Sequence, residues 1–120
     1  PKAARTNSIA ELVDIYPTLC ELTAGESPTH LQGNSLVSAL ESPDEIFKNR
    51  ALARYQKGET LIVDQLFYTE WQQKGKVVSK MLYNHETDPN ETINLANDPA
   101  YLSIVKGLSQ QLEQFKMTFN

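Results

Sequence analysis

The sequence predicts an α+β protein with two layers, in which a four-stranded antiparallel sheet packs against one long C-terminal helix and shorter N-terminal helices precede the sheet. Two observations favour this fold class. Four short strand-like segments follow one another between residues 50 and 83, and their short connections make neighbouring strands antiparallel. Beyond them, apolar residues recur at steps of three and four up to residue 119, which is the period of an α-helix.

The size and composition fit a single domain over residues 1–120, with 40% hydrophobic and 22% charged residues. The net charge of −4 argues against a nucleic-acid partner, because such partners favour basic faces. No apolar run approaches the length of a membrane span, so no membrane partner is expected. The single cysteine excludes an internal disulfide, and the sequence does not indicate the compartment.

The first helix is predicted to begin after Asp14 as its N-cap, because Pro17 then falls in the first turn, where no intrahelical donor is needed. Residues 8–12 are predicted to be an extended approach to it. We expect the helix to stop before Gly25, a residue type that favours the position after a helix end. Three apolar residues are spaced as one stripe that should be buried: Ile15, Leu19 and Leu22.

A second, short helix is predicted over residues 36–40, with Asn34 or Ser35 as its cap. Gly33 ends the loop before it. The polar segment 41–45 that follows contains a proline and is predicted to be a surface loop.

The sheet is predicted from segments that are rich in apolar residues and separated by turn signals. The four strands are expected at residues 50–55, 60–63, 66–71 and 77–83. Asp64 and Gln65 leave a two-residue gap suited to a hairpin, although a longer loop is the alternative because Gln suits a positive φ poorly. The segment 74–76 makes the next turn.

The C-terminal helix is predicted from Pro99 to about Phe115, with Asp98 as its N-cap. Its apolar stripe should lie across one face of the sheet. The stripe consists of Leu102, Val105, Leu108, Leu112, Phe115 and Phe119.

The sheet is expected to carry apolar residues on both faces, because alternate residues of a strand point to opposite sides. In the third strand, one face carries Leu66, Tyr68 and Glu70, and the other carries Phe67, Thr69 and Trp71. The long helix covers one of these faces, and the first helix and the helix over residues 36–40 could cover part of the second. A sheet that is apolar on both faces, with one long helix, predicts a further partner.

No catalytic or metal site is predicted from the cysteine, the histidines or the polar run 88–98. Cys20 lies inside the first helix and is expected to be a small buried residue. His30 and His85 are expected on the surface; metal binding by His85 and neighbouring carboxylates is the less favoured alternative. The polar run is better explained by turns and helix caps than by calcium.

The same region carries a family resemblance. Its matching segments are Leu82-Tyr83-Asn84, Thr87-Asp88-Pro89, Glu91-Thr92 and Asn94-Leu95-Ala96. The pattern resembles the C-terminal signature of the formylglycine-dependent (type I) sulfatases, approximately Leu-Tyr-Asp, then Asp-Pro-x-Glu-x-x-Asn-Leu-Ala. Residues 14–22 and 31–36 resemble two further family segments, Asp-aliphatic-x-Pro-Thr-Leu-x-x-Leu and Leu-Gln-Gly-x-Ser-Leu. The sequence of residues 13–22 is most similar to that of the iduronate-2-sulfatase-like group.

The resemblance implies that the chain is the C-terminal subdomain of an alkaline-phosphatase-like sulfatase fold. The parent would be a sulfuric ester hydrolase acting on sulfated sugars, with calcium and a formylglycine made from a Cys/Ser-x-Pro/Ala-x-Arg motif. Cys20 lacks that context, so no catalytic residue, metal ligand or cofactor is assigned to this chain. The fragment is expected to be inactive alone, to partner the catalytic domain and to form one wall of the cleft.

Arg54 and Gln56 are the candidate substrate-binding residues, since the resemblance places the loop after the first strand near the mouth of the cleft. A surface ion pair is the alternative for Arg54, and we favour it slightly. The iduronate-type enzymes commonly carry an arginine in the next strand, where this chain has Ile62. That difference argues against iduronate specificity.

Two other functions remain open. The chain could be a free-standing interaction module, with a homodimer formed through the exposed sheet face. It could also be the C-terminal part of a related phosphonate or phosphodiester hydrolase.

Overall fold

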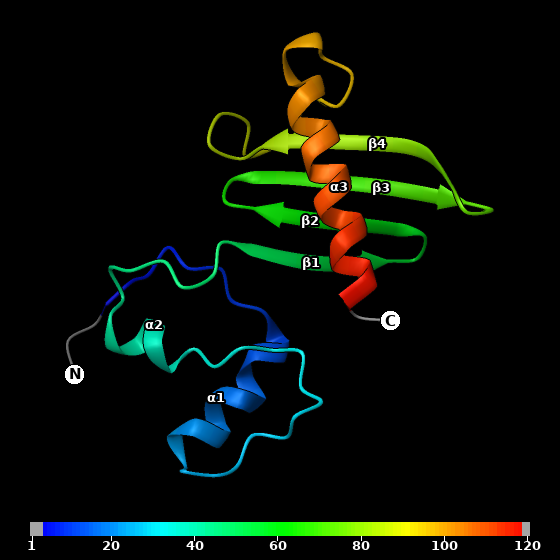
Figure 1. Cartoon of the computed structure of the whole chain (residues 1–120). Coiled ribbons are helices and arrows are strands. Elements are labelled where there is room, and N and C mark those ends of the chain that lie inside the picture. The colour runs from blue at the N-terminus through cyan, green and yellow to red at the C-terminus, as the bar shows by residue number, and fades with distance from the viewer. Residues whose placement is uncertain (1–3, 119–120) are drawn as a thin grey trace. The chain divides into compact units, whose positions relative to one another are not determined.

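The computed structural model describes residues 4–118, and the chain divides into two compact units, residues 1–49 and 50–120 (Figure 1). The first unit holds short helices joined by loops, and the second holds the sheet and the long helix. The single domain over residues 1–120 stays a prediction.

The first unit contains a 3-10 turn η1 (Leu12–Asp14), helix α1 (Ile15–Leu22) and helix α2 (Val37–Glu41). As predicted, α1 begins directly after Asp14 and keeps Pro17 in its first turn. The predicted capping by Asp14 is wrong, because its side chain makes no cap hydrogen bond to α1 and instead accepts the backbone N–H of Glu11. Leu12, predicted to be extended, opens the 3-10 turn. The left-handed position after the helix falls on Ala24, at φ 52°, and not on Gly25. Gly25 instead donates its backbone N–H to the carbonyl of Cys20 at 2.8 Å, which closes the helix one residue earlier than the glycine suggested.

The predicted burial of the α1 stripe is wrong. Ile15, Leu19 and Leu22 are each half exposed or more. The buried residues of α1 are Pro17 and Thr18. Within its unit the helix packs through these two residues, and the Thr18 hydroxyl accepts the backbone N–H of Leu36 before α2. Its apolar stripe stays half exposed or more.

Helix α2 begins one residue later than predicted. The N-cap position falls on Leu36, which makes no side-chain cap hydrogen bond, so neither Asn34 nor Ser35 is the cap. Ser35 Oγ still accepts the backbone N–H of Val37 at 3.2 Å from the position before the cap. The backbone N–H of Asn34 binds the carboxylate of Asp14 at 2.9 Å.

The second unit is a four-stranded antiparallel sheet in the order β1-β2-β3-β4, which confirms the predicted topology (Figure 1). Its strands are β1 (Arg50–Tyr55), β2 (Gly58–Val63), β3 (Leu66–Gln73) and β4 (Lys76–Asn84). The first has the predicted bounds, and the others extend one or two residues further. A bulge between Trp71 and Gln72 interrupts the pairing of β3 with β4.

The β2–β3 turn is the two-residue hairpin, so the longer loop offered as an alternative is wrong. Val63 pairs directly with Leu66. Asp64 takes the positive φ of 51°, and aspartate tolerates this conformation better than most residues. Lys74 and Gly75 make the β3–β4 turn with φ values of 51° and 74°.

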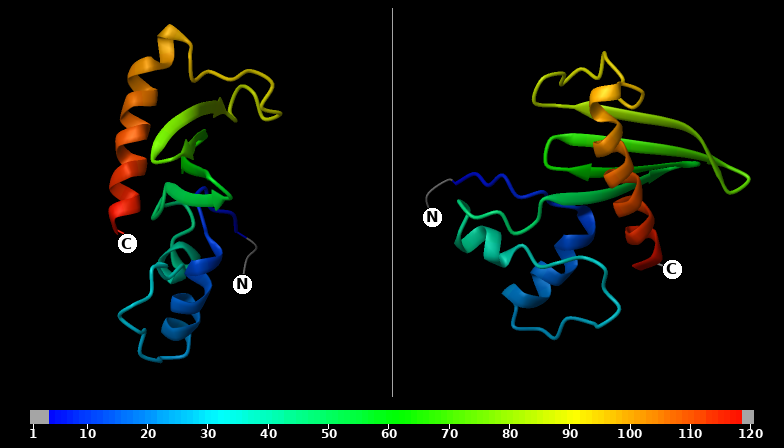
Figure 2. Two further views of the ribbon diagram at one scale, coloured as in Figure 1. Left: turned by 90° about the vertical axis from the view of Figure 1, so that its right-hand side faces the viewer. Right: turned by 45° about the horizontal axis from the view of Figure 1, so that its top comes forward.

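The long helix begins as predicted at Pro99, with one 3-10 turn η2 (Pro99–Tyr101) before α3 (Leu102–Thr118). The carboxylate of Asp98 accepts the backbone N–H of Ala100 at 2.9 Å and so caps the start. Figure 2 shows α3 lying along one face of the sheet, which confirms the two-layer arrangement.

The core lies between α3 and the sheet. Its buried members are Leu61, Tyr68, Leu82, Ala96, Val105, Leu108 and Leu112. Phe115 packs against this cluster as predicted. Leu102 is mostly exposed, because it stands in the first turn of α3 at the edge of the layer, so its predicted burial is wrong. Phe119 lies outside the described residues.

The second face of the sheet is called here the open face. The strand register places these side chains on it: Ala51, Thr60, Ile62, Phe67, Thr69, Trp71, Met81 and Tyr83. Within residues 50–118, no helix or strand covers this face (Figure 2). The hydroxyl groups of Thr60 and Thr69 form a hydrogen bond across the strands, with 2.8 Å between the two Oγ1 atoms. The aromatic side chains on the same face are half-buried.

Candidate functional site

A shallow pocket of about 310 Å³ lies where the β1–β2 turn meets the last turns of α3, and we call it the turn pocket. Its lining consists of Arg54, Gln56, Lys57, Glu59, Gln72 and Lys116. The backbone N–H of Gln72 donates to the carbonyl of Lys57 at 3.0 Å, which fixes the turn against β3. Both predicted substrate-binding residues, Arg54 and Gln56, line this pocket, and the contact of either with substrate stays a prediction.

Glu59 is the electrostatic centre of the turn pocket. Its two carboxylate oxygens each bind one cation, Arg54 Nη2 at 2.6 Å and Lys116 Nζ at 2.8 Å. Burial alone would raise the pKa of Glu59, but the hydrogen bonds from Lys116 and then Arg54 outweigh burial and lower it. Glu59 is therefore charged at neutral pH.

Arg54 thus makes the ion pair that we favoured from the sequence. Its side chain is nevertheless 62% exposed, so guanidinium donors beyond the pair reach solvent. Gln56 lies in the turn with a φ of 54° and is one of the lining residues of the pocket.

Lys116 is a pocket residue that sequence reasoning missed. It stands four residues after Leu112 of the buried stripe, and residues four apart share a helix face. That spacing was the available signal. The pKa of Lys116 is raised, mainly by the hydrogen bond to Glu59, and Glu113 adds a weaker contact at 3.3 Å.

The motif over residues 14–18 acts as the organiser of the first unit. The fully buried carboxylate of Asp14 accepts the backbone N–H groups of Glu11 (2.8 Å) and Asn34 (2.9 Å), and it pairs with Lys48 Nζ at 2.6 Å. Thr18 Oγ1 donates to the Asp14 carbonyl at 2.6 Å and accepts from the backbone of Leu36 at 2.8 Å. These residues therefore have structural roles that explain the motif without catalysis.

The signature over residues 84–98 is also structural. Asn94 Oδ1 accepts the backbone N–H of Leu82 at 3.0 Å, and its Nδ2 donates to the carbonyl of Lys80 at 3.1 Å. The side chain thereby mimics a peptide group along the outer edge of β4. Asp88 accepts from the backbone of Ile93 at 2.9 Å, which closes the preceding turn. Asp88, Asn94 and Asp98 thus have the predicted turn and cap roles, whereas the Glu91 side chain binds His85.

The remaining candidate groups do not form a reactive centre. Cys20 is a free, half-buried thiol, less buried than predicted because it stands at the side of α1. His30 is exposed as predicted, whereas His85 is half-buried, stacked on Phe67 and 2.9 Å from Glu91 Oε1. Among residues 4–118, no three His, Cys, Asp or Glu side chains gather in a way that could hold a metal ion.

A buried polar network joins α3 to the sheet. Glu70 Oε1 accepts from Tyr68 Oη at 2.7 Å and from Ser109 Oγ at 2.5 Å. Burial, and then the bond to Glu70, raise the pKa of Tyr68 far above its ordinary value. Tyr68 stays a neutral donor at all physiological pH values.

Comparison with known proteins places the chain in a family. The model of the family "N-sulphoglucosamine sulphohydrolase, C-terminal" matches residues 1–118. A sulfatase of Formosa agariphila is 26% identical over 121 residues, covering 100% of this chain and 23% of the relative.

Solved structures share the fold. The structure of BT4656 in complex with its substrate D-glucosamine-2-N,6-O-disulfate aligns with a TM-score of 0.79 and 20% identity, over 88% of this chain and 24% of that one. The phosphonate monoester hydrolase of Agrobacterium radiobacter aligns with a TM-score of 0.69 and 22% identity, over 89% and 25%. The chain thus spans about a quarter of the length of these relatives. In the described part of the chain, no helix has the length and apolarity needed to cross a membrane.

Proposed function

The chain belongs to the N-sulphoglucosamine sulphohydrolase C-terminal family, and on that premise we propose that it is the non-catalytic C-terminal part of an enzyme that hydrolyses sulfate esters of sugars. The observation that carries the proposal is the family match over residues 1–118, combined with coverage of only about a quarter of each relative. The structural roles of the motif residues support the proposal. These residues stabilise the fold, and the catalytic residues for sulfate ester hydrolysis would lie elsewhere in the parent.

The parent would hold calcium and a formylglycine outside this chain. The residues described here do not fit either group: they form no cluster of metal ligands, and Cys20 sits in a helix without the required proline and arginine. When bound, calcium and formylglycine supply the electrophilic and nucleophilic chemistry of sulfate ester cleavage. The chain alone should have no sulfatase activity.

The proposed partner is the catalytic domain of the parent. Each of the two units has an apolar surface, and both surfaces support a partner domain that packs against them. One is the exposed side of η1 and α1 in the first unit, made by Leu12, Val13, Ile15, Leu19 and Leu22. The other is the open face of the second unit, with half-buried aromatic residues. Monomeric proteins seldom expose large contiguous apolar patches.

Arg54 and Gln56 would contribute to one wall of the substrate cleft. The turn pocket supports this role, because a guanidinium that reaches solvent beside two lysines attracts a sulfate or a carboxylate. Substitution of Arg54 by Gln in the parent should raise KM for a sulfated sugar about tenfold with little change in kcat. An unchanged KM would remove Arg54 from the cleft.

The iduronate-2-sulfatase-like subgroup is the finer form of the proposal. The sequence of residues 13–22 supports it. Ile62 argues against iduronate specificity, since it occupies the strand position where the iduronate-type enzymes commonly have an arginine. It lies half-buried on the open face between Ala51 and Phe67.

Two alternatives rest on specific observations. The structural likeness to a phosphonate monoester hydrolase supports a parent that cleaves a phosphonate ester. The exposed apolar surfaces also support an interaction module or homodimer.

The coding sequence before Pro1 provides the first test. We expect it to encode a Cys/Ser-x-Pro/Ala-x-Arg motif several hundred residues upstream. A start codon directly before Pro1, together with a dimer in analytical ultracentrifugation, would refute the sulfatase proposal and favour the interaction module.

A further inference from the structure

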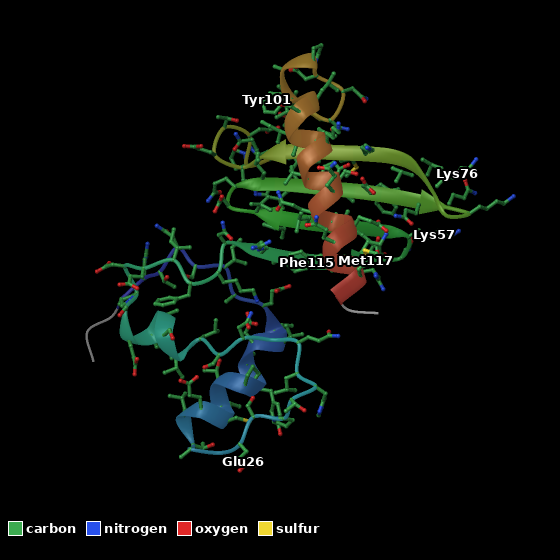
Figure 3. The ribbon with its side chains drawn as sticks, viewed as in Figure 1. Glu26, Lys57, Lys76, Tyr101, Phe115 and Met117 are labelled. Carbon is green, nitrogen blue, oxygen red and sulfur yellow. The ribbon has the colours of Figure 1, made fainter. Side chains whose placement is uncertain are left out.

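The end of the sheet that holds the turn pocket carries a cluster of cations on an otherwise acidic chain. The β1–β2 and β3–β4 turns lie at this end, because successive turns of an antiparallel meander alternate between ends (Figure 1). The cations there are Arg54, Lys57, Lys74, Lys76 and Lys116, and we call them the basic end. Figure 3 shows Lys57 and Lys76 on the two turns.

The basic end keeps a net positive charge after its internal pairs are counted. Glu59 and Glu113 pair with Arg54 and Lys116. Within the described part of the chain, the exposed Lys57, Lys74 and Lys76 make no salt bridge. The chain as a whole has 15 acidic and 11 basic residues, so the basic end has the opposite sign of charge to the whole chain. Such local asymmetry concentrates anions at one surface.

The geometry suits an extended ligand better than a single ion. The β3–β4 hairpin continues past the β1–β2 turn, since Trp71 pairs with Gly58 while Gln73 pairs with Lys76 beyond it. Two further strand residues correspond to about 7 Å. The lysines therefore continue outward from the turn pocket, and a ligand with repeated anionic groups can meet several of them.

We propose that the basic end binds sulfated glycan, holding sugar units that are not themselves being hydrolysed. The turn pocket takes one sulfate through the exposed Arg54 and Lys57, and the hairpin lysines contact neighbouring sulfates. This inference extends the proposed sulfated-sugar substrate class. Its test measures binding, so it can fail while sulfate hydrolysis stands, and it can stand if the hydrolysed ester proves different.

The test measures salt-dependent binding of the whole protein that contains this chain to immobilised heparin. The variant Lys57→Gln/Lys76→Gln removes two exposed cations that pair with nothing in the described fold. The control Arg5→Gln/Lys106→Gln removes the same charge from exposed positions elsewhere. Two unit charges near their sulfates in water contribute enough that we expect roughly tenfold weaker binding at low salt. The control should bind like the wild type.

Three outcomes would overturn the proposal. One is equal weakening in both variants, which would mean that only net charge matters. Another is undiminished binding to fully desulfated heparin, whose carboxylates remain. The third is equal affinity for single-stranded DNA, which would indicate a surface for polyanions in general. Thermal unfolding of each variant checks that the fold is intact. The variant Glu59→Gln provides an independent test. It should bind heparin more tightly, because Arg54 and Lys116 lose the carboxylate that pairs with them.

Discussion

Replacement of Asp14 by Asn should destabilise the first unit strongly, although the two side chains have almost the same shape. The carboxylate is fully buried and accepts two backbone N–H groups as well as Lys48 Nζ. An Asn amide offers one oxygen, so its NH₂ group must face at least one of these donors. A buried donor without an acceptor costs about 1–3 kcal/mol.

Loss of the charge adds a second cost. Breaking one side of a buried ion pair costs about 3–5 kcal/mol, but Lys48 keeps Glu11 Oε2 at 2.8 Å, which reduces that cost. We therefore expect the substitution to lower the free energy of unfolding of this unit by about 3 kcal/mol.

The assay is amide hydrogen exchange of Asn34 and Leu36, whose N–H groups bind Asp14 and Thr18. Their protection should fall by about two orders of magnitude, the equivalent of about 3 kcal/mol. Glu11→Gln is the milder control, since it removes a partly exposed partner of Lys48. A change below tenfold in Asp14→Asn would refute the assigned role of the buried carboxylate.

The same variant should alter the pH dependence of stability. Burial raises the pKa of Asp14, but the hydrogen bond from Lys48 and those from the backbone of Asn34 and Glu11 outweigh it, so the folded pKa lies below the ordinary value. Its stabilisation is therefore complete above the unfolded pKa near 3.9 and is lost as pH falls through the lower folded value. Asp14→Asn should lack this acid-dependent loss.

Three further predictions concern packing and charge. Gly33→Ala should cost the first unit about 3 kcal/mol in urea unfolding, because its Cβ would lie 1.9 Å from the carbonyl oxygen of Val13; a cost below 1 kcal/mol would contradict that contact. Leu108→Ala should cost the second unit about 2–5 kcal/mol in thermal unfolding, since the side chain is buried under α3, and a neutral result would argue against the helix–sheet core. Glu59→Gln should flatten the acid limb of stability below about pH 4.5, because the lowered pKa of Glu59 stabilises the fold only above that range; an unchanged limb would refute the charged triad with Lys116.

The sheet could be predicted because its evidence is local. Short connections fix antiparallel neighbours, and the turn residues from Asp64 to Gly75 punctuate the strands where the structure turns. The helix cap at Asp98 is equally local, since Asp and Pro in succession favour a helix start. These features need no knowledge of what lies across the molecule.

The covering of each apolar face could not be predicted, because periodicity identifies an apolar side without identifying its neighbour. The stripe of α3 packs against the sheet, whereas Leu19 and Leu22 of α1 stay more than half exposed. Long-range polar pairs were missed for a related reason. Ser109 binds Glu70 across 39 residues of sequence, and no local pattern marks such a pair.

Part of the lining of the turn pocket follows from the sequence, while substrate binding there stays a prediction. Arg54 and Gln56 are close in sequence, so their shared pocket follows from the tight turn between β1 and β2. Lys116 joins them only because α3 crosses the sheet at a particular angle, which sequence does not specify. Its spacing from Leu112 predicts the helix face but not the pocket.

Sulfate release is the most direct measurement of where the chemistry resides. The whole protein and a chain limited to residues 1–120 would be incubated in parallel with sulfated glucosamine, and inorganic sulfate would be quantified. We expect release by the whole protein and none by the 120-residue chain. Sulfate release by the isolated chain would contradict the central claim, because the reactive group would then have to lie among these residues.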